Sequence, residues 1–157
     1  MKELSNITTV VCDFDGVLTN NNVFISDNGQ EYVSCSRSDG IGFKLLQQNN
    51  IETFILSTEV SNIVQFRSKK MGVRAFNGVQ DKKSFLRNYC AENSLDPRTI
   101  AYIGNDLNDL EAMNFVGYKV CPNDAWPEII DISDLILKSK GGEGVVREFS
   151  SYLLNHE

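Results

Sequence analysis

The stretch that decides the fold covers residues 10–19 and reads VVCDFDGVLT. An apolar, β-branched run leads directly into two aspartates one residue apart, Asp13 and Asp15, and Gly16 follows them. Such a run is typical of a strand that is buried on both faces of a sheet. In an extended segment, side chains two residues apart point the same way, so both carboxylates are expected to face one space beyond the strand. Because like charges at that separation repel each other, the pair requires a compensating cation.

Similar apolar runs recur along the chain, with helical patterns between them. The expected strands are residues 7–12, 51–56, 73–76, 100–103, 116–121 and 135–137. The expected helices are residues 40–48, 61–71, 82–93, 108–114, 126–131 and 144–154. This alternation predicts an α/β fold in which a parallel sheet of fully buried strands is flanked by helices on both faces.

One segment interrupts the alternation. The sequence VFISDNGQEYVSC, residues 23–35, contains two strand-like runs around DNG, which is a strong signal for a β-hairpin. We expect a hairpin flap over about residues 22–36 that projects from the same end of the sheet as Asp13. The whole chain, residues 1–157, is expected to form one domain around this flap.

Composition excludes several classes of function. The chain has 15 basic and 21 acidic residues, and a net charge of −6 argues against a nucleic-acid partner. Four separated cysteines without metal-ligand spacing predict reduced thiols in a cytoplasmic protein. No apolar run approaches the roughly 18 residues of a membrane span, so no membrane partner is expected. The single histidine, His156, is the penultimate residue, so acid–base chemistry is expected to use carboxylates.

Polar residues follow further strands of the predicted sheet. They are Ser57, Thr58 and Glu59 after residues 51–56, Lys82 in the helix start after 73–76, and Asn105, Asp106 and Asp109 after 100–103. The carboxyl ends of parallel strands meet at one edge, where ligands bind in open α/β sheets. The sequence therefore predicts one site built from four segments that are far apart in the chain.

The chemistry of this set is that of phosphoryl transfer. Asp13 and Asp15, with Asn105 or Asp106, offer the oxygen ligands that Mg²⁺ prefers, and Mg²⁺ commonly shares its coordination with a phosphate group. A lysine neutralises phosphate charge, a serine hydroxyl donates to phosphate oxygens, and an aspartate can attack phosphorus. Each motif alone also suits a turn, a helix cap or a solvated charge. An EF-hand is excluded, because the twelfth position counted from Asp13 is Phe24 instead of glutamate.

These residues resemble a known family, the haloacid dehalogenase superfamily, whose fold is Rossmann-like. DFDGVLT resembles its first motif, LSTE its second, Lys82 its third and GNDLND its fourth. Three features resemble one small-cap clade: the hairpin in place of a large cap domain, SDGIG opening the first helix, and GGEGVVREF near the C-terminus. That clade contains 3-deoxy-manno-octulosonate 8-phosphate phosphatase and 2-keto-3-deoxynononate 9-phosphate phosphatase, enzymes of lipopolysaccharide and sialic acid metabolism.

The resemblance implies a role for each residue. Asp13 would be the nucleophile that forms an aspartyl-phosphate, and Asp15 the general acid and base. Ser57, Thr58 and Lys82 would hold the phosphoryl oxygens. Asp13, Asp15, Asn105 and Asp106 would supply the Mg²⁺ ligands, and Asp109 would orient the metal ligands and Lys82. Members of the clade are typically homotetramers in which the flap meets a neighbour's site.

Substrate choice depends on two further residues in this resemblance. Glu59 and Lys70 resemble the nononate-type pattern, which favours a nine-carbon, sialic-acid-type 9-phosphate; the alternative substrate is the eight-carbon octulosonate 8-phosphate. Asn105 stands where the family usually has an aspartate, which predicts weaker metal binding. A second alternative is therefore a non-catalytic assembly domain linked to a sialic-acid cytidylyltransferase.

Overall fold

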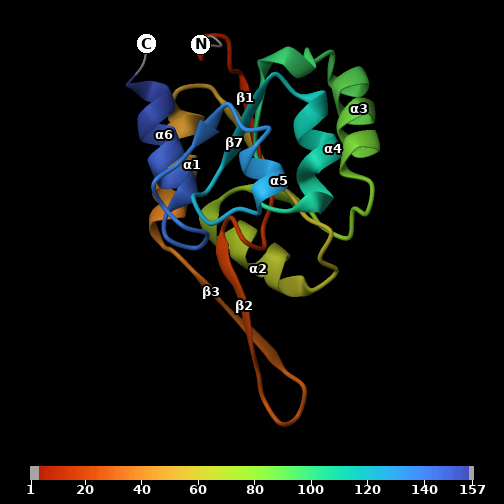
Figure 1. Ribbon diagram of the computed structural model, residues 1–157, viewed down its shortest axis with the longest axis vertical. Helices are drawn as coiled ribbons and strands as arrows, with labels where there is room; N and C mark the ends of the chain where they lie inside the picture. Colours follow the sequence, from red (N-terminus) through yellow and green to blue (C-terminus); the bar gives the residue numbers. More distant parts are fainter. Residues whose placement is uncertain (1–3, 156–157) are drawn as a thin grey trace.

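The computed structural model describes residues 4–155 and contains a six-stranded parallel sheet between two layers of helices (Figure 1). The strands are β1 (Thr9–Cys12), β4 (Glu52–Leu56), β5 (Arg74–Phe76), β6 (Ile100–Ile103), β7 (Tyr118–Cys121) and β8 (Leu135–Ile136). Their order across the sheet is β5-β4-β1-β6-β7-β8, and every neighbouring pair is parallel. β1, which ends directly before Asp13, is therefore an inner strand of the sheet, with β4 on one side and β6 on the other.

The helices are α1 (Ser38–Gln48), α2 (Asn62–Met71), α3 (Lys82–Asn93), α4 (Leu107–Phe115), α5 (Pro127–Ile130) and α6 (Val145–Leu154). Successive residues of β1 face opposite layers, because side chains alternate across a strand. Val10 packs in the layer with α1 and α6, and Val11 packs in the layer with α3 and α4. Figure 1 shows these two helix groups on opposite sides of the sheet.

The two edge strands correct one expectation from the sequence. All six strands were expected to be buried on both faces, but β5 and β8 contain only exposed and half-buried residues. Each edge strand has a neighbour on one side only. The central strands β1 and β6 are fully buried.

The hairpin predicted from DNG is present as an antiparallel flap of β2 (Thr19–Ile25) and β3 (Glu31–Cys35). Its turn closes where the Ser26 amide donates to the Gln30 carbonyl at 2.9 Å, and Gly29 takes a φ of 81°. Figure 1 shows the flap extending well away from the sheet and its helices. β2 begins at Thr19, three residues before the predicted start, so the flap leaves the body of the protein directly after the DFDG segment.

Within the part of the chain that the structure describes, no helix is both long and apolar enough to cross a membrane. His156 lies outside the described residues.

Candidate active site

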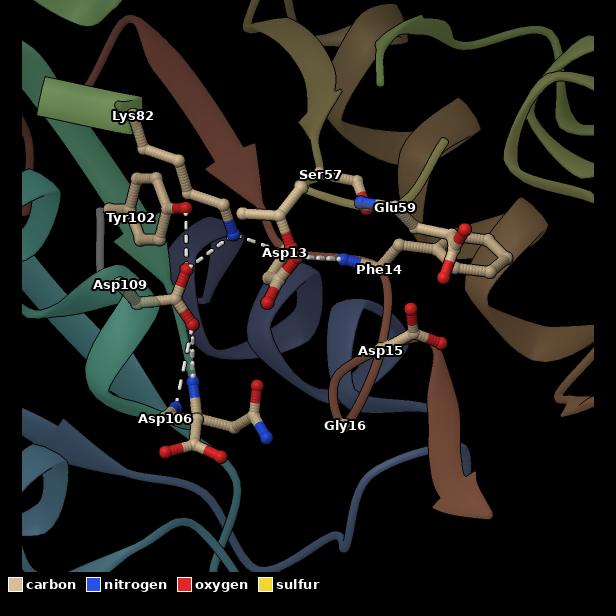
Figure 2. A network of polar contacts seen from close by, with 12 residues as sticks. Asp13, Phe14, Asp15, Gly16, Ser57, Glu59, Lys82, Tyr102, Asp106 and Asp109 are labelled. Atoms are coloured by element: carbon tan, nitrogen blue, oxygen red, sulfur yellow. Dashed lines mark hydrogen bonds and ion pairs between the residues drawn. The ribbon is translucent and has the colours of Figure 1, made fainter. Parts of the chain in front are cut away.

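The predicted site segments meet at the carboxyl ends of β1, β4 and β6. A cavity of about 300 Å³ opens there, and it is lined by Asp13, Asp15, Asn21, Thr58, Asn105, Asp106 and Asn108. Lys82, the first residue of α3, reaches the same place from the far side of Asp13 (Figure 2). The structure therefore brings together residues from four segments, as the sequence predicts.

Asp13 is the most constrained carboxylate that lines this cavity. Only 3% of its surface is exposed, and its Oδ1 accepts from the Phe14 amide at 2.7 Å and lies 2.9 Å from Lys82 Nζ. Burial and the nearby charge of Asp109 raise the pKa of Asp13 to about 7, against the opposing effect of Lys82. The backbone amide and the ammonium group together hold the orientation of this carboxylate.

Lys82 is a buried cation between two aspartates. Its Nζ lies 2.7 Å from Asp109 Oδ1 as well as 2.9 Å from Asp13 Oδ1. Burial favours the neutral amine, but the two carboxylates outweigh it and raise the pKa of Lys82. Lys82 is held at the start of α3 by the N-cap residue Asp81, whose side chain accepts from the Ser84 amide at 2.9 Å.

Asp109 connects the lysine to the loop after β6. Its side chain is fully buried. Asp109 Oδ1 accepts from Lys82 Nζ at 2.7 Å and from the Tyr102 hydroxyl at 2.8 Å. Asp109 Oδ2 accepts from the backbone amide of Asn105 at 2.9 Å. Asp109 and the N-cap residue Asp106 also form a capping box at the start of α4. Sequence reasoning did not single out Tyr102, whose only signal is a tyrosine within an otherwise aliphatic buried strand.

Asp15 lies at the mouth of the site, where the chain turns toward the flap. It is partly buried, Thr19 Oγ1 donates to it at 3.3 Å, and burial raises its pKa. Gly16 follows with a φ of 81°, and a Cβ at this position would lie 2.0 Å from Asn105 Nδ2. Both the conformation and the contact require glycine, and they place the DFDG turn directly against the loop after β6.

The side-chain oxygen of Asn105 indicates whether the cavity can hold a metal ion. Its side chain is 5% exposed and lines the cavity with Asp13 and Asp15, yet its Oδ1 is buried without a hydrogen-bond partner. A buried acceptor of this kind is costly unless something binds it. Between residues 4 and 155 no group of three or more His, Cys, Asp or Glu residues is placed to hold a metal. Two aspartates and one amide oxygen nevertheless form an oxygen donor set, which fits Mg²⁺.

Asp106, the other predicted ligand on this loop, also lines the cavity. Its Oδ1 accepts from the Leu107 amide at 2.7 Å, so part of this carboxylate caps α4.

The segment after β4 is organised around the start of α2. Ser57 is 1% exposed and its Oγ accepts from the Glu59 amide at 3.1 Å, while Thr58 lines the cavity. Glu59 Oε1 accepts from the amide of Ser61, the N-cap of α2, at 2.8 Å. The Glu59 carboxylate therefore supports the entry into α2, and its charge contributes to the raised pKa of Asp15.

Lys70 occupies a different place. It lies in the last turn of α2 and lines a separate pocket of about 690 Å³ with Arg37, Lys44 and Arg67. It is not among the residues that line the cavity beside Asp13. Glu59 is also absent from that lining, so neither predicted specificity residue is among the described residues that line the cavity.

The SDGIG and GGEGVVREF segments meet behind the site. Asp39, in the first turn of α1, is 1% exposed and accepts from the Val146 amide at 2.9 Å at the start of α6. Burial raises the pKa of Asp39 to about 6, although the amides of α6 oppose this shift. Both segments carry the family resemblance, and only the fold brings them close enough to form a hydrogen bond.

Comparisons with known proteins agree with this geometry. Residues 44–149 match the model of the haloacid dehalogenase-like hydrolases. The 3-deoxy-D-manno-octulosonate 8-phosphate phosphatase of Salmonella typhi is 31% identical over 155 residues, which are 98% of this chain and 82% of that protein.

Solved structures extend the likeness to three dimensions. The Moraxella catarrhalis 3-deoxy-D-manno-octulosonate 8-phosphate phosphatase, in complex with magnesium, phosphate and KDO, is similar with a TM-score of 0.92 at 28% identity, over 98% of this chain and 89% of that one. The cobalt-bound deoxy-D-mannose-octulosonate 8-phosphate phosphatase of Haemophilus influenzae gives a TM-score of 0.91 at 31% identity, over 98% and 90% of the two chains. The chain therefore belongs to the haloacid dehalogenase-like hydrolases and is a phosphatase of the 3-deoxy-D-manno-octulosonate 8-phosphate phosphatase family.

Proposed function

We propose that this protein is a Mg²⁺-dependent phosphatase of a phosphorylated 2-keto-3-deoxy sugar acid, with octulosonate 8-phosphate as the leading candidate. The observation that carries the proposal is the buried Asp13–Lys82–Asp109 chain beside a cavity lined by Asp15 and Asn105. Transfer of a phosphoryl group through an aspartate needs three groups: a nucleophile, a cationic side chain that binds the phosphate, and a second carboxylate that acts as acid and base. Asp13, Lys82 and Asp15 are the residues proposed for these roles.

In the proposed first step, one carboxylate oxygen of Asp13 attacks phosphorus and the bond from phosphorus to the sugar oxygen breaks. Asp15 gives its proton to the departing sugar oxygen. In the second step Asp15 takes a proton from water, the water oxygen attacks phosphorus, and phosphate leaves Asp13. The raised pKa of Asp15, caused mainly by burial, supports its role as the acid.

Lys82, Ser57 and Thr58 are the proposed contacts of the phosphoryl oxygens. The Lys82 ammonium group has three N–H donors, and Asp13 and Asp109 take two of them, which leaves one for a phosphate oxygen. Asp13, Asp15 and Asn105, with Asp106 beside them, would hold Mg²⁺. When bound, this cation would neutralise charge on the phosphate and offset the repulsion between the aspartates.

The choice of sugar follows from the relatives more than from the two residues singled out in the sequence. Similar proteins at about 30% identity are named for the eight-carbon octulosonate 8-phosphate. Glu59 is the observation that keeps the nine-carbon 9-phosphate as a second candidate, since it lies close enough to Asp15 to affect its pKa. Lys70 lines a separate pocket of the same chain and adds no support at the cavity.

A phosphate-release assay with Mg²⁺ tests the proposal. The substrates are octulosonate 8-phosphate, nononate 9-phosphate and N-acetylneuraminate 9-phosphate, and the largest kcat/KM is expected for the first. A preference for either nine-carbon substrate would restore the interpretation based on Glu59. Release from none of these substrates, together with no Mg²⁺ binding, would favour the alternative of a non-catalytic assembly domain.

The nucleophile is tested by Asp13→Asn, which keeps the size of the side chain but removes the attacking carboxylate. We expect phosphate release to fall by about a thousandfold or more, as for the loss of other nucleophiles. Glu92→Gln, which removes a carboxylate from an exposed position near the end of α3 opposite Lys82, is the control and should keep wild-type activity. Comparable release by Asp13→Asn and wild type would refute the aspartyl-phosphate mechanism.

A further inference from the structure

We propose that Tyr102 is a positioning residue of this phosphatase: through Asp109, its hydroxyl holds Lys82 in place for the phosphate. The inference rests on the proposed role of Lys82 in binding phosphoryl oxygens. Tyr102 is not among the described residues that line the cavity, and its hydroxyl donates to Asp109.

The backbone of Tyr102 is held on both sides. It lies on β6, where its neighbours across the sheet are Val11 of β1 and Lys119 of β7. Its side chain is completely buried in the core layer that also contains α3 and α4, the two helices that carry Lys82 and Asp109. The ring is therefore a rigid support from which the hydroxyl reaches Asp109 Oδ1 at 2.8 Å (Figure 2).

The direction of this hydrogen bond is fixed. Asp109 is an acceptor, and Lys82 Nζ already donates to the same Oδ1 at 2.7 Å. Burial and the charge of Asp109 raise the pKa of Tyr102 well above its usual range, so the hydroxyl keeps its proton. Tyr102 therefore donates, and Asp109 accepts from the side chains of both Tyr102 and Lys82.

Four donors on two oxygens set the orientation of the Asp109 carboxylate. Tyr102 and Lys82 donate to Oδ1, and the backbone amides of Asn105 and Asp106 donate to Oδ2 at 2.9 and 3.5 Å. Without the hydroxyl, Lys82 would be the only donor to Oδ1, and the carboxylate would be free to turn toward the ammonium group. Lys82 Nζ would then move toward Asp109 and away from Asp13, and the third N–H would no longer point where the phosphate binds.

The test measures binding of inorganic phosphate to the full-length protein in the presence of Mg²⁺, by calorimetry. Tyr102→Phe removes one hydroxyl from the core and should weaken phosphate binding by roughly tenfold, the size expected when a hydrogen bond to a charged group is lost. Tyr118→Phe is the matched control, because Tyr118 is also a buried tyrosine, on the next strand, and its hydroxyl bonds to Tyr152. Its phosphate affinity should stay within about twofold of wild type.

A double-mutant cycle separates positioning from a general structural effect. Lys82→Met alone should abolish most phosphate binding, and adding Tyr102→Phe to Lys82→Met should cause no further loss. Crystal structures of wild type and Tyr102→Phe provide a second readout that does not need the Lys82 variant to fold. In Tyr102→Phe the contact between Lys82 Nζ and Asp13 Oδ1 should be longer than in wild type.

Two results would overturn the inference alone. In the first, Tyr102→Phe binds phosphate as tightly as wild type although Lys82→Met loses binding. In the second, Tyr102→Phe lowers the phosphate affinity by the same factor whether residue 82 is lysine or methionine. Wild-type phosphate affinity in Lys82→Met would overturn the proposed role of Lys82 and the inference together.

Discussion

Asn105 is the residue at which the site departs from the pattern of its family. The side chain is nearly buried, its Oδ1 has no partner, and its Nδ2 packs against Gly16, so the position is shaped for a small planar side chain. An amide oxygen can bind Mg²⁺ but brings no negative charge. In the proposed metal site, the negative charge would therefore come mainly from Asp13 and Asp15, whose pKa values are raised mainly by burial.

Asn105→Asp should tighten Mg²⁺ binding, because it adds a unit charge at a buried position next to two existing oxygen donors. We expect the dissociation constant to fall by about fivefold or more, since one unit charge in direct contact is worth at least about 1 kcal/mol even in water. Calorimetric titration with Mg²⁺ measures this without any substrate.

Asn108→Asp is the control for this charge effect. It adds the same charge to the lining of the same cavity, but from an exposed position, where solvent screens it. A gain in affinity as large in Asn108→Asp as in Asn105→Asp would contradict a specific role for position 105.

At the scale of elements, α1 and α6 pack closely against each other. Gly42 of α1 lies so close to α6 that a Cβ would come within 2.7 Å of the Arg147 backbone nitrogen. Gly42→Ala should therefore reduce the free energy of unfolding by about 1 to 3 kcal/mol, because backbone atoms of α6 would have to move. Urea denaturation measures the change.

Gly40→Ala provides the matched control in the same helix. A Cβ at Gly40 would meet Met71 Cγ at 3.5 Å, which is ordinary contact. Alanine also favours the helix, so this variant should gain about 0.5 to 1 kcal/mol. Equal effects at the two positions would refute the close approach of α1 and α6.

Protonation of Asp39, at the contact between α1 and α6, makes the stability of the protein depend on pH. Its pKa is raised from 3.8 to about 6 in the folded protein, so the folded state binds this proton more tightly than the unfolded chain does. The stability from this group is full below the unfolded pKa and is lost as the pH rises through the folded one.

Relative to Asp39→Asn, wild type should lose on the order of 3 kcal/mol of unfolding free energy between about pH 4 and pH 7. Urea denaturation at several pH values measures this difference. Asp27→Asn removes a charge from the exposed flap turn and serves as the control. A difference between wild type and Asp39→Asn that does not change with pH would contradict the prediction.

The elements themselves were largely predictable from the sequence. Apolar runs and helical periodicity located all six sheet strands and all six helices within a few residues, because local patterns determine these elements. DNG located the flap for the same reason. The convergence of Asp13, Lys82 and Asp109 also followed, because a parallel sheet collects the carboxyl ends of its strands at one edge.

The remaining features depend on contacts that no local pattern encodes. The sequence around Tyr102 indicates only a buried strand residue. The packing of β6 against α3 and α4 brings its hydroxyl to Asp109. The sequence around Asp39 indicates only an acidic residue in the first turn of a helix. Its hydrogen-bond donors are backbone amides of α6, more than a hundred positions away. The paired interpretation of Glu59 and Lys70 depended on family resemblance, and their positions relative to the cavity required the fold.

At the scale of the whole molecule, the flap extends beyond the sheet and its helices. Isolated two-stranded hairpins are marginally stable in water, yet this one extends away from the body (Figure 1). Four large apolar side chains on it are half or more exposed: Val23, Phe24, Ile25 and Tyr32. Because side chains alternate across a strand, Phe24 and its cross-strand partner Tyr32 share one face of the hairpin, and Val23 and Ile25 share the other. Exposed apolar side chains gathered on one element are typical of a contact with another protein. The homotetramer implied by the family resemblance, in which each flap would meet a neighbouring subunit, stays a prediction.

Phe24→Ser tests that prediction, because Phe24 is 65% exposed and its ring contributes little to the stability of one isolated chain. Light scattering on a sizing column is expected to give a tetramer for wild type and smaller species for Phe24→Ser. Ile136→Ser, at the exposed edge strand β8, is the control and should leave the mass unchanged. A monomeric wild type, or a tetramer that Phe24→Ser leaves intact, would exclude the flap as the contact that holds the subunits together.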